Sequence, residues 1–179
     1  MHAAYDARMR PLLAVPVAVL ACLLLTGCAS MAAAREDGAT YLLVRHAEKD
    51  LAAGKDPPLT AAGAARAQRL AASLADQPLD AIYSSSTRRT RQTAEPVARA
   101  KTQDIIAYDP TDATAFARRL RAEHPTGTVL VIGHSDTLPP LARALCGCIV
   151  ADMDERDYGI RHTVHIDALG HASLHESRD

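Results

Sequence analysis

The chain has few aromatic residues, with no Trp, one Phe and five Tyr among its 179 residues. Its core must therefore be built mainly from Ala, Leu, Val and Ile. Single-stranded nucleic acids and glycans are commonly held by stacking on aromatic faces, so neither is an expected ligand. The chain also lacks an excess of charge of one sign, since 20 Lys and Arg stand against 21 Asp and Glu. Nucleic-acid-binding proteins usually show a basic excess, so the sequence predicts no nucleic-acid partner.

The remaining composition is that of an ordinary globular protein. Hydrophobic residues make up 48% of the chain and charged residues 23%, close to the averages for soluble domains. The length corresponds to about one domain. We found no internal repeat and no low-complexity tract, which excludes repeat architectures.

An apolar run of about 15 residues, the length of a secretory signal, follows Arg8 and Arg10 near the N-terminus. It is shorter than the roughly 20 residues that a membrane-spanning helix needs. The run ends in Leu25-Thr26-Gly27-Cys28. This ending resembles the lipobox of bacterial lipoproteins, in which the cysteine is lipidated and becomes the new N-terminus. A plain signal peptide and an uncleaved anchor are the alternatives.

The lipobox resemblance implies a division of the chain into three parts. We expect a signal peptide at 1–27, a lipidated tether at 28–39 beginning with Cys28, and a single domain at 40–179. The implied location is the bacterial cell envelope, where the protein would be anchored through its lipid and face the periplasm.

Short apolar runs alternate with Ala- and Arg-rich stretches beyond residue 40. The runs predict strands at 41–44, 80–83 and 128–132, and the alternating C-terminal pattern predicts edge strands at 163–166 and 172–174. Helices are expected at 61–75, 87–101, 111–124 and 138–145. Strands that alternate with helices predict an α/β three-layer sandwich, with a mostly parallel sheet and helices on both faces.

Two cysteines, Cys146 and Cys148, lie within the predicted domain. A disulfide between residues two apart is expected to be strained, so we expect two unpaired, small apolar residues near the end of a helix. An oxidised pair is the alternative. No His or Cys pair at ligand spacing accompanies them, so a zinc site is not expected there.

Polar side chains follow three of the predicted strands directly. Arg45 and His46 follow the first strand, Arg89 comes shortly after the second, and His134 follows the third. In open α/β sheets ligands bind outside the carboxyl ends of the strands, so these residues should meet in one crevice. Arginine pairs well with phosphate oxygens, and a neutral histidine can act as a nucleophile. The set therefore favours a site for a phosphoryl group.

Three sequence blocks together resemble the histidine phosphatase superfamily, which has the phosphoglycerate-mutase-like fold. Arg45-His46-Ala47-Glu48 resembles the Arg-His-Gly signature, in the variant branch that reads Arg-His-Ala-Glu-Lys. The segment 85–94 resembles the family block that carries its second arginine, and Gly133-His134-Ser135 resembles the block around its second histidine. The order and spacing agree with the family across residues 41–167.

The resemblance implies a mechanism for the site residues. His46 would attack phosphorus and form a phosphohistidine, while Arg45, Arg89 and His134 would contact the phosphoryl oxygens. No cofactor and no metal are implied. The general acid is the least certain assignment: we take Glu48 as the first candidate, and the alternatives are Asp136, Asp109 and Asp112.

The resulting hypothesis is a metal-independent phosphatase that hydrolyses phosphomonoesters or phosphohistidine. Its substrate would be a small phosphorylated molecule or a phosphorylated envelope component, selected by the loops at 49–58 and 103–112. The alternatives are a catalytically inactive phosphate-binding lipoprotein, a phosphomutase, and a zinc-binding protein. The zinc ligands would be His46, Glu48, His134 and Asp136. The sequence does not indicate an oligomeric state.

Overall fold

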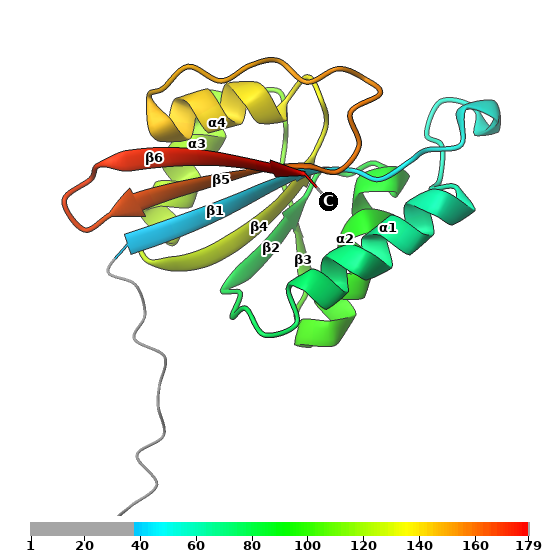
Figure 1. Ribbon diagram of the computed structural model, residues 1–179, viewed down its shortest axis with the longest axis horizontal. Helices are drawn as coiled ribbons and strands as arrows, with labels where there is room; N and C mark the ends of the chain where they lie inside the picture. The colour runs from blue at the N-terminus through cyan, green and yellow to red at the C-terminus, as the bar shows by residue number, and fades with distance from the viewer. Residues whose placement is uncertain (1–37, 179) are drawn as a thin grey trace, which may run out of the picture. The chain divides into compact units, whose positions relative to one another are not determined.

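The computed structural model describes residues 38–178, which form a mixed six-stranded sheet with helices on both faces (Figure 1). Cys28, the predicted signal peptide and most of the predicted tether lie outside the described residues. Gly38 and Ala39 are described, and they belong to the first strand rather than to a tether. Among residues 38–178, no helix is long and apolar enough to cross a membrane. The elements in chain order are β1 (Gly38–Arg45), α1 (Ala61–Ser73), β2 (Ala81–Ser84), α2 (Arg88–Lys101), β3 (Ile105–Ala107), α3 (Ala113–Glu123), β4 (Gly127–Gly133), α4 (Leu138–Cys146), β5 (Ile160–Asp167) and β6 (Ala172–Arg178).

The strand order is β3-β2-β4-β1-β5-β6. The first four strands of this order pair in parallel, whereas β5 and β6 are antiparallel. β1 and β4 occupy the centre of the sheet, and their continuous apolar runs are buried on both faces, as expected for parallel strands covered by helices. The mostly parallel α/β sandwich predicted from the sequence is confirmed.

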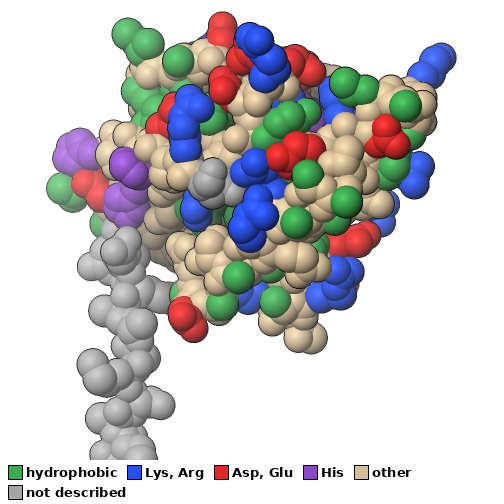
Figure 2. All heavy atoms as spheres, turned by 45° about the vertical axis from the view of Figure 1, so that its right-hand side comes forward, with side chains coloured by type: hydrophobic (Ala, Val, Ile, Leu, Met, Phe, Trp, Pro, Cys, Tyr) green, Lys and Arg blue, Asp and Glu red, His purple; other side chains and the backbone are tan. Residues whose placement is uncertain are grey.

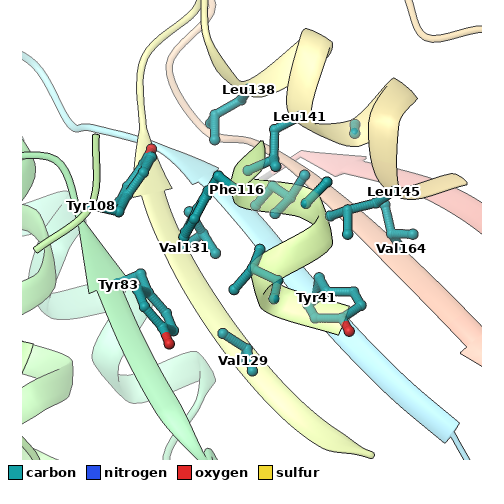
Figure 3. Packing of buried hydrophobic residues seen from close by; sticks show 14 of the residues in the cluster. Tyr41, Tyr83, Tyr108, Phe116, Val129, Val131, Leu138, Leu141, Leu145 and Val164 are labelled. Atoms are coloured by element: carbon teal, nitrogen blue, oxygen red, sulfur yellow. The ribbon is translucent and has the colours of Figure 1, made fainter. Parts of the chain in front are cut away.

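Alternate side chains of the central strands pack into two separate cores. On one face, Leu42 and Val44 pack with α1 and α2. On the other face, Tyr41 and Leu43 pack with α3 and α4. The second core contains a cluster of aromatic side chains, in which the rings of Tyr108 and Phe116 stack with centroids 4.2 Å apart (Figure 3).

Two of the helices, α1 and α3, begin at residues whose side chains cap them. The Thr60 side chain accepts a hydrogen bond from the Gly63 amide at the start of α1, and Asp112 caps α3 through the Ala115 amide. Such caps satisfy amides that have no partner within the helix.

On the face shown in Figure 2, Lys and Arg side chains are interspersed with Asp and Glu.

The structure corrects the prediction for the two cysteines, because Cys146 and Cys148 form a disulfide. Gly147 ends α4 in the left-handed conformation with φ of 63°, which glycine adopts without steric cost. The resulting turn brings the two Cα atoms to 5.1 Å, within the usual range for a disulfide. The short spacing is therefore compatible with a bond once a glycine separates the two cysteines.

Candidate active site

The predicted site residues meet at the carboxyl ends of the parallel strands. His46 directly follows β1, His134 directly follows β4, and Arg89 lies in the first turn of α2, just beyond β2. These three residues line one cavity of about 560 Å³. The remaining lining residues are Lys49, Pro110, Thr111, Ala113, Asp136, Thr137, Pro140 and Glu155. Residues from both predicted specificity loops are thus among those that line the cavity.

His46 is buried, and its protonation state follows from its contacts. Ring atom Nδ1 lies 2.8 Å from the carbonyl oxygen of Ala47. Because a carbonyl oxygen can only accept, Nδ1 must carry the hydrogen. Burial is the main cause that lowers the pKa of His46 to about 3, and His134, Arg45 and Arg89 lower it further. The ring is therefore neutral near pH 7, with the lone pair of Nε2 available to a ligand.

His134 lies against His46, with ring centroids 5.3 Å apart. Its Nδ1 is 3.5 Å from a terminal nitrogen of Arg89, and its Nε2 is 2.9 Å from the Ser85 hydroxyl. A guanidinium only donates, so Nδ1 accepts and Nε2 donates to Ser85. Burial, followed by the charge of Arg89, lowers the pKa of His134 to about 4. Both histidines are thus neutral near pH 7.

Ser85 binds the Nε2 side of the His134 ring, and Thr90 in turn contacts Ser85. The Ser85 hydroxyl lies 2.9 Å from the Thr90 hydroxyl, and Thr90 donates to the carbonyl oxygen of Ser85. Both residues are buried. Their hydroxyls fix the ring orientation, a supporting role that the sequence resemblance did not identify.

The two arginines occupy different positions. Arg89 lines the cavity and lies 3.7 Å from the Asp56 carboxylate. Arg45 is fully buried beneath Tyr158, 4.3 Å from its ring centre, and does not line the cavity. Its two terminal nitrogens donate to the carbonyl oxygens of the loop at 154–157. Within residues 38–178, however, the buried Nε atoms of both arginines have no hydrogen-bond partner.

Glu48, the first candidate for the general acid, is not placed in the cavity. Its carboxylate is bound by Arg66 of α1 at 2.8 Å and lies outside the residues that line the cavity. The hydrogen bonds from Arg66 are the main cause that lowers the pKa of Glu48, which makes it a poor proton donor. The alternatives Asp109 and Asp112 form a turn and a helix cap. Asp136 is the predicted candidate that lines the cavity.

The proposed zinc set is not brought together, because Glu48 faces Arg66 instead of the two histidines. Over residues 38–178, no group of three or more His, Cys, Asp or Glu side chains is arranged to hold a metal ion. The cavity also contains Arg89 and Lys49, whose charges repel a cation. These positively charged hydrogen-bond donors suit an anionic ligand.

Sequence reasoning missed one charged residue of the cavity, Glu155, and one residue beside it, Tyr158. Lys49 lies in the predicted loop 49–58 and lines the cavity. Glu155 comes from the loop between α4 and β5, where no pattern marks it. Tyr158, from the same loop, covers Arg45 and lies 6.2 Å from the His46 ring, centroid to centroid.

Comparison with known sequences finds a family for the part of the chain that carries the first two motifs. Residues 41–110 match the model of the histidine phosphatase superfamily, branch 1. No curated protein matches the chain.

Solved structures support the same fold. The protein histidine phosphatase SixA complexed with tungstate is 21% identical, with a TM-score of 0.68, over 78% of this chain and 96% of that one. The putative phosphohistidine phosphatase SixA from Agrobacterium tumefaciens is 24% identical, with a TM-score of 0.60, over 78% and 98%. A phosphoglycerate mutase from Bacillus anthracis is 16% identical, with a TM-score of 0.58, over 80% and 94%. The fold is therefore phosphoglycerate-mutase-like.

Proposed function

We propose that the protein is a phosphatase that hydrolyses phosphomonoesters or phosphohistidine through a phosphohistidine on His46. The observation that carries this proposal is the state of His46. Its single ring N–H, at Nδ1, donates a hydrogen bond to the carbonyl oxygen of Ala47, and the pKa of His46 is lowered to about 3. The nucleophilic lone pair on Nε2 is therefore present at neutral pH without a separate base.

The buried donors near His46 supply the second part of the argument. The Nε–H groups of Arg45 and Arg89 are buried without a partner among residues 38–178. A buried donor without a partner is costly, and the oxygens of a phosphoryl group would satisfy both. Charge on these oxygens is greatest in the transition state, so preorganised donors lower the barrier.

The reaction follows in two steps. Nε2 of His46 forms a bond to phosphorus as the bond to the leaving oxygen breaks, and Asp136, which lines the cavity, gives that oxygen a proton. Water then attacks phosphorus and returns a proton to Asp136, the N–P bond breaks, and inorganic phosphate leaves with His46 neutral again. Arg89 and His134 stay beside the phosphoryl group in both steps. No step requires a metal ion.

The test is hydrolysis of an aryl phosphate by the purified chain in the presence of EDTA, with wild type compared with His46→Asn. We expect turnover in wild type that survives EDTA and is lost in the variant. Brief incubation with labelled substrate should trap an acid-labile, alkali-stable phosphoryl group on wild type only. Turnover abolished by EDTA would contradict metal independence. Phosphate binding without turnover or phosphoenzyme would instead indicate a binding protein.

We further propose that the chain is a lipoprotein anchored through Cys28 at the periplasmic face of the bacterial envelope. The support is the short apolar run and the segment at 25–28 that resembles a lipobox. The substrates would then be small phosphate esters or phosphorylated envelope components. Labelling with a fatty acid in a bacterial host tests this, because incorporation should be lost in Cys28→Ala. Equal incorporation by both proteins would contradict the proposal.

A further inference from the structure

A lysine and a glutamate form an ion pair within the catalytic cavity, and the proposed mechanism does not use it. Lys49 Nζ lies 3.3 Å from an Oε atom of Glu155. Both residues line the cavity together with His46, Arg89 and His134. The charge of Lys49 also lowers the pKa of His134, which places the ammonium within electrostatic range of that ring.

The Glu155 carboxylate is surrounded by hydrogen-bond donors that could also bind a phosphoryl group. Besides Lys49, it is approached by the Ser135 hydroxyl at 3.4 Å and by a terminal nitrogen of Arg45 at 3.9 Å. These three groups are all donors, and hydrogen bonds between charged groups and phosphate oxygens are among the stronger ones in proteins. The carboxylate thus neutralises a set of donors that suits an anionic ligand.

The ion pair is built so that the Glu155 side chain can leave while the loop stays in place. The Glu155 backbone carbonyl is fixed by Arg45 at 2.8 Å, whereas its side chain is 72% exposed. Lys49 is only 17% exposed, so its ammonium remains directed at the cavity. Exposed ion pairs contribute little to stability, so a ligand that carries two negative charges can displace the carboxylate.

Resting on the proposed function, we propose that Lys49 is a phosphoryl-binding residue and that Glu155 is its internal counter-ion, exchanged for the phosphoryl group of the substrate. Arg45 donates three N–H groups to loop carbonyls, which leaves its Nε–H for a phosphoryl oxygen. Lys49 adds a positive charge that lines the cavity itself. Glu155 competes with anionic ligands and favours those with a full dianionic phosphate over singly charged anions.

The test is the dissociation constant for inorganic phosphate, measured by calorimetry on the full chain at a pH where phosphate is mostly dianionic. Lys49→Gln should weaken binding about tenfold or more, the loss expected when a charged hydrogen bond is removed. Lys49→Arg should restore most of the affinity. Glu155→Gln should tighten binding severalfold, an effect in the opposite direction that damage to the fold would not produce.

The double variant and a control complete the design. If Glu155 acts through Lys49, Glu155→Gln should tighten binding much less once Lys49→Gln is present. Lys55→Gln changes an exposed lysine of the same segment and should bind phosphate like wild type. Unchanged affinity in Lys49→Gln, or no gain in Glu155→Gln, would overturn this inference alone. Failure of wild type to bind phosphate would overturn the proposed function as well.

Discussion

The low pKa of His46 predicts that this residue makes the folded protein less stable in mild acid. In the unfolded chain a histidine titrates with a pKa of 6.5, whereas in the folded protein the pKa of His46 is about 3. Between these values the unfolded state binds more protons than the folded state, so stability falls as the pH falls below about 6.5. The contribution vanishes above that pH, where His46 is neutral in both states.

The size of this effect follows from the two values. Each pH unit below 6.5 costs about 1.4 kcal/mol until the folded pKa is reached, so at pH 5 His46 costs about 2 kcal/mol relative to pH 8. His46→Asn removes the titration. The Asn amide can still donate to the Ala47 carbonyl in place of Nδ1, so the local structure should be retained.

The assay is urea unfolding of both proteins at pH 8 and at pH 5. We expect the free energy of unfolding to fall by about 2 kcal/mol less in His46→Asn than in wild type between the two pH values. The matched control is His175→Asn, because the His175 ring lies at the exposed face of β6 and is solvated in both states. An identical pH dependence in wild type and His46→Asn would refute the reasoning.

Three further predictions follow from the site and the fold. Asp136→Asn should slow hydrolysis of alkyl phosphates by about 10²- to 10⁴-fold but affect p-nitrophenyl phosphate much less, since nitrophenolate leaves without a proton; equal losses on both would contradict the acid role. Gly63→Ala usually stabilises a helix, but here the new Cβ meets the Glu48 backbone carbonyl, so unfolding should show a loss of about 1–3 kcal/mol. Cys146→Ser with Cys148→Ser should cost about 1–2 kcal/mol, because the disulfide closes a very short loop; an unchanged melting temperature would contradict this.

The part of the site that was predictable from sequence is the part attached directly to central strands. His46 follows β1 and His134 follows β4, and these strands are adjacent and parallel. Their apolar runs identify them as buried, and the edge at which parallel strands end fixes where the next side chains go. Arg89 was predictable for the same reason, since α2 starts just beyond β2.

Side-chain direction within the same segment was not predictable from the motif. Glu48 is two residues from His46, yet its carboxylate turns to Arg66 of α1, a contact between residues 18 positions apart. Strand periodicity does not extend into the loop after β1, so no pattern distinguishes a carboxylate that faces the cavity from one that faces a helix. Asp136 has the same spacing from His134 and lines the cavity.

Glu155 and Tyr158 could not be found from sequence, because their position depends on a contact made more than 100 residues away. The loop between α4 and β5 has no apolar periodicity, and what places it is the buried guanidinium of Arg45, which binds its carbonyl oxygens at 154, 155 and 157. The motif that contains His46 therefore also positions the loop that contains Glu155. Under the proposed function, Arg45 links the phosphoryl site to the counter-ion of Lys49, and replacing Arg45 would disturb this positioning as well as any contact through Nε.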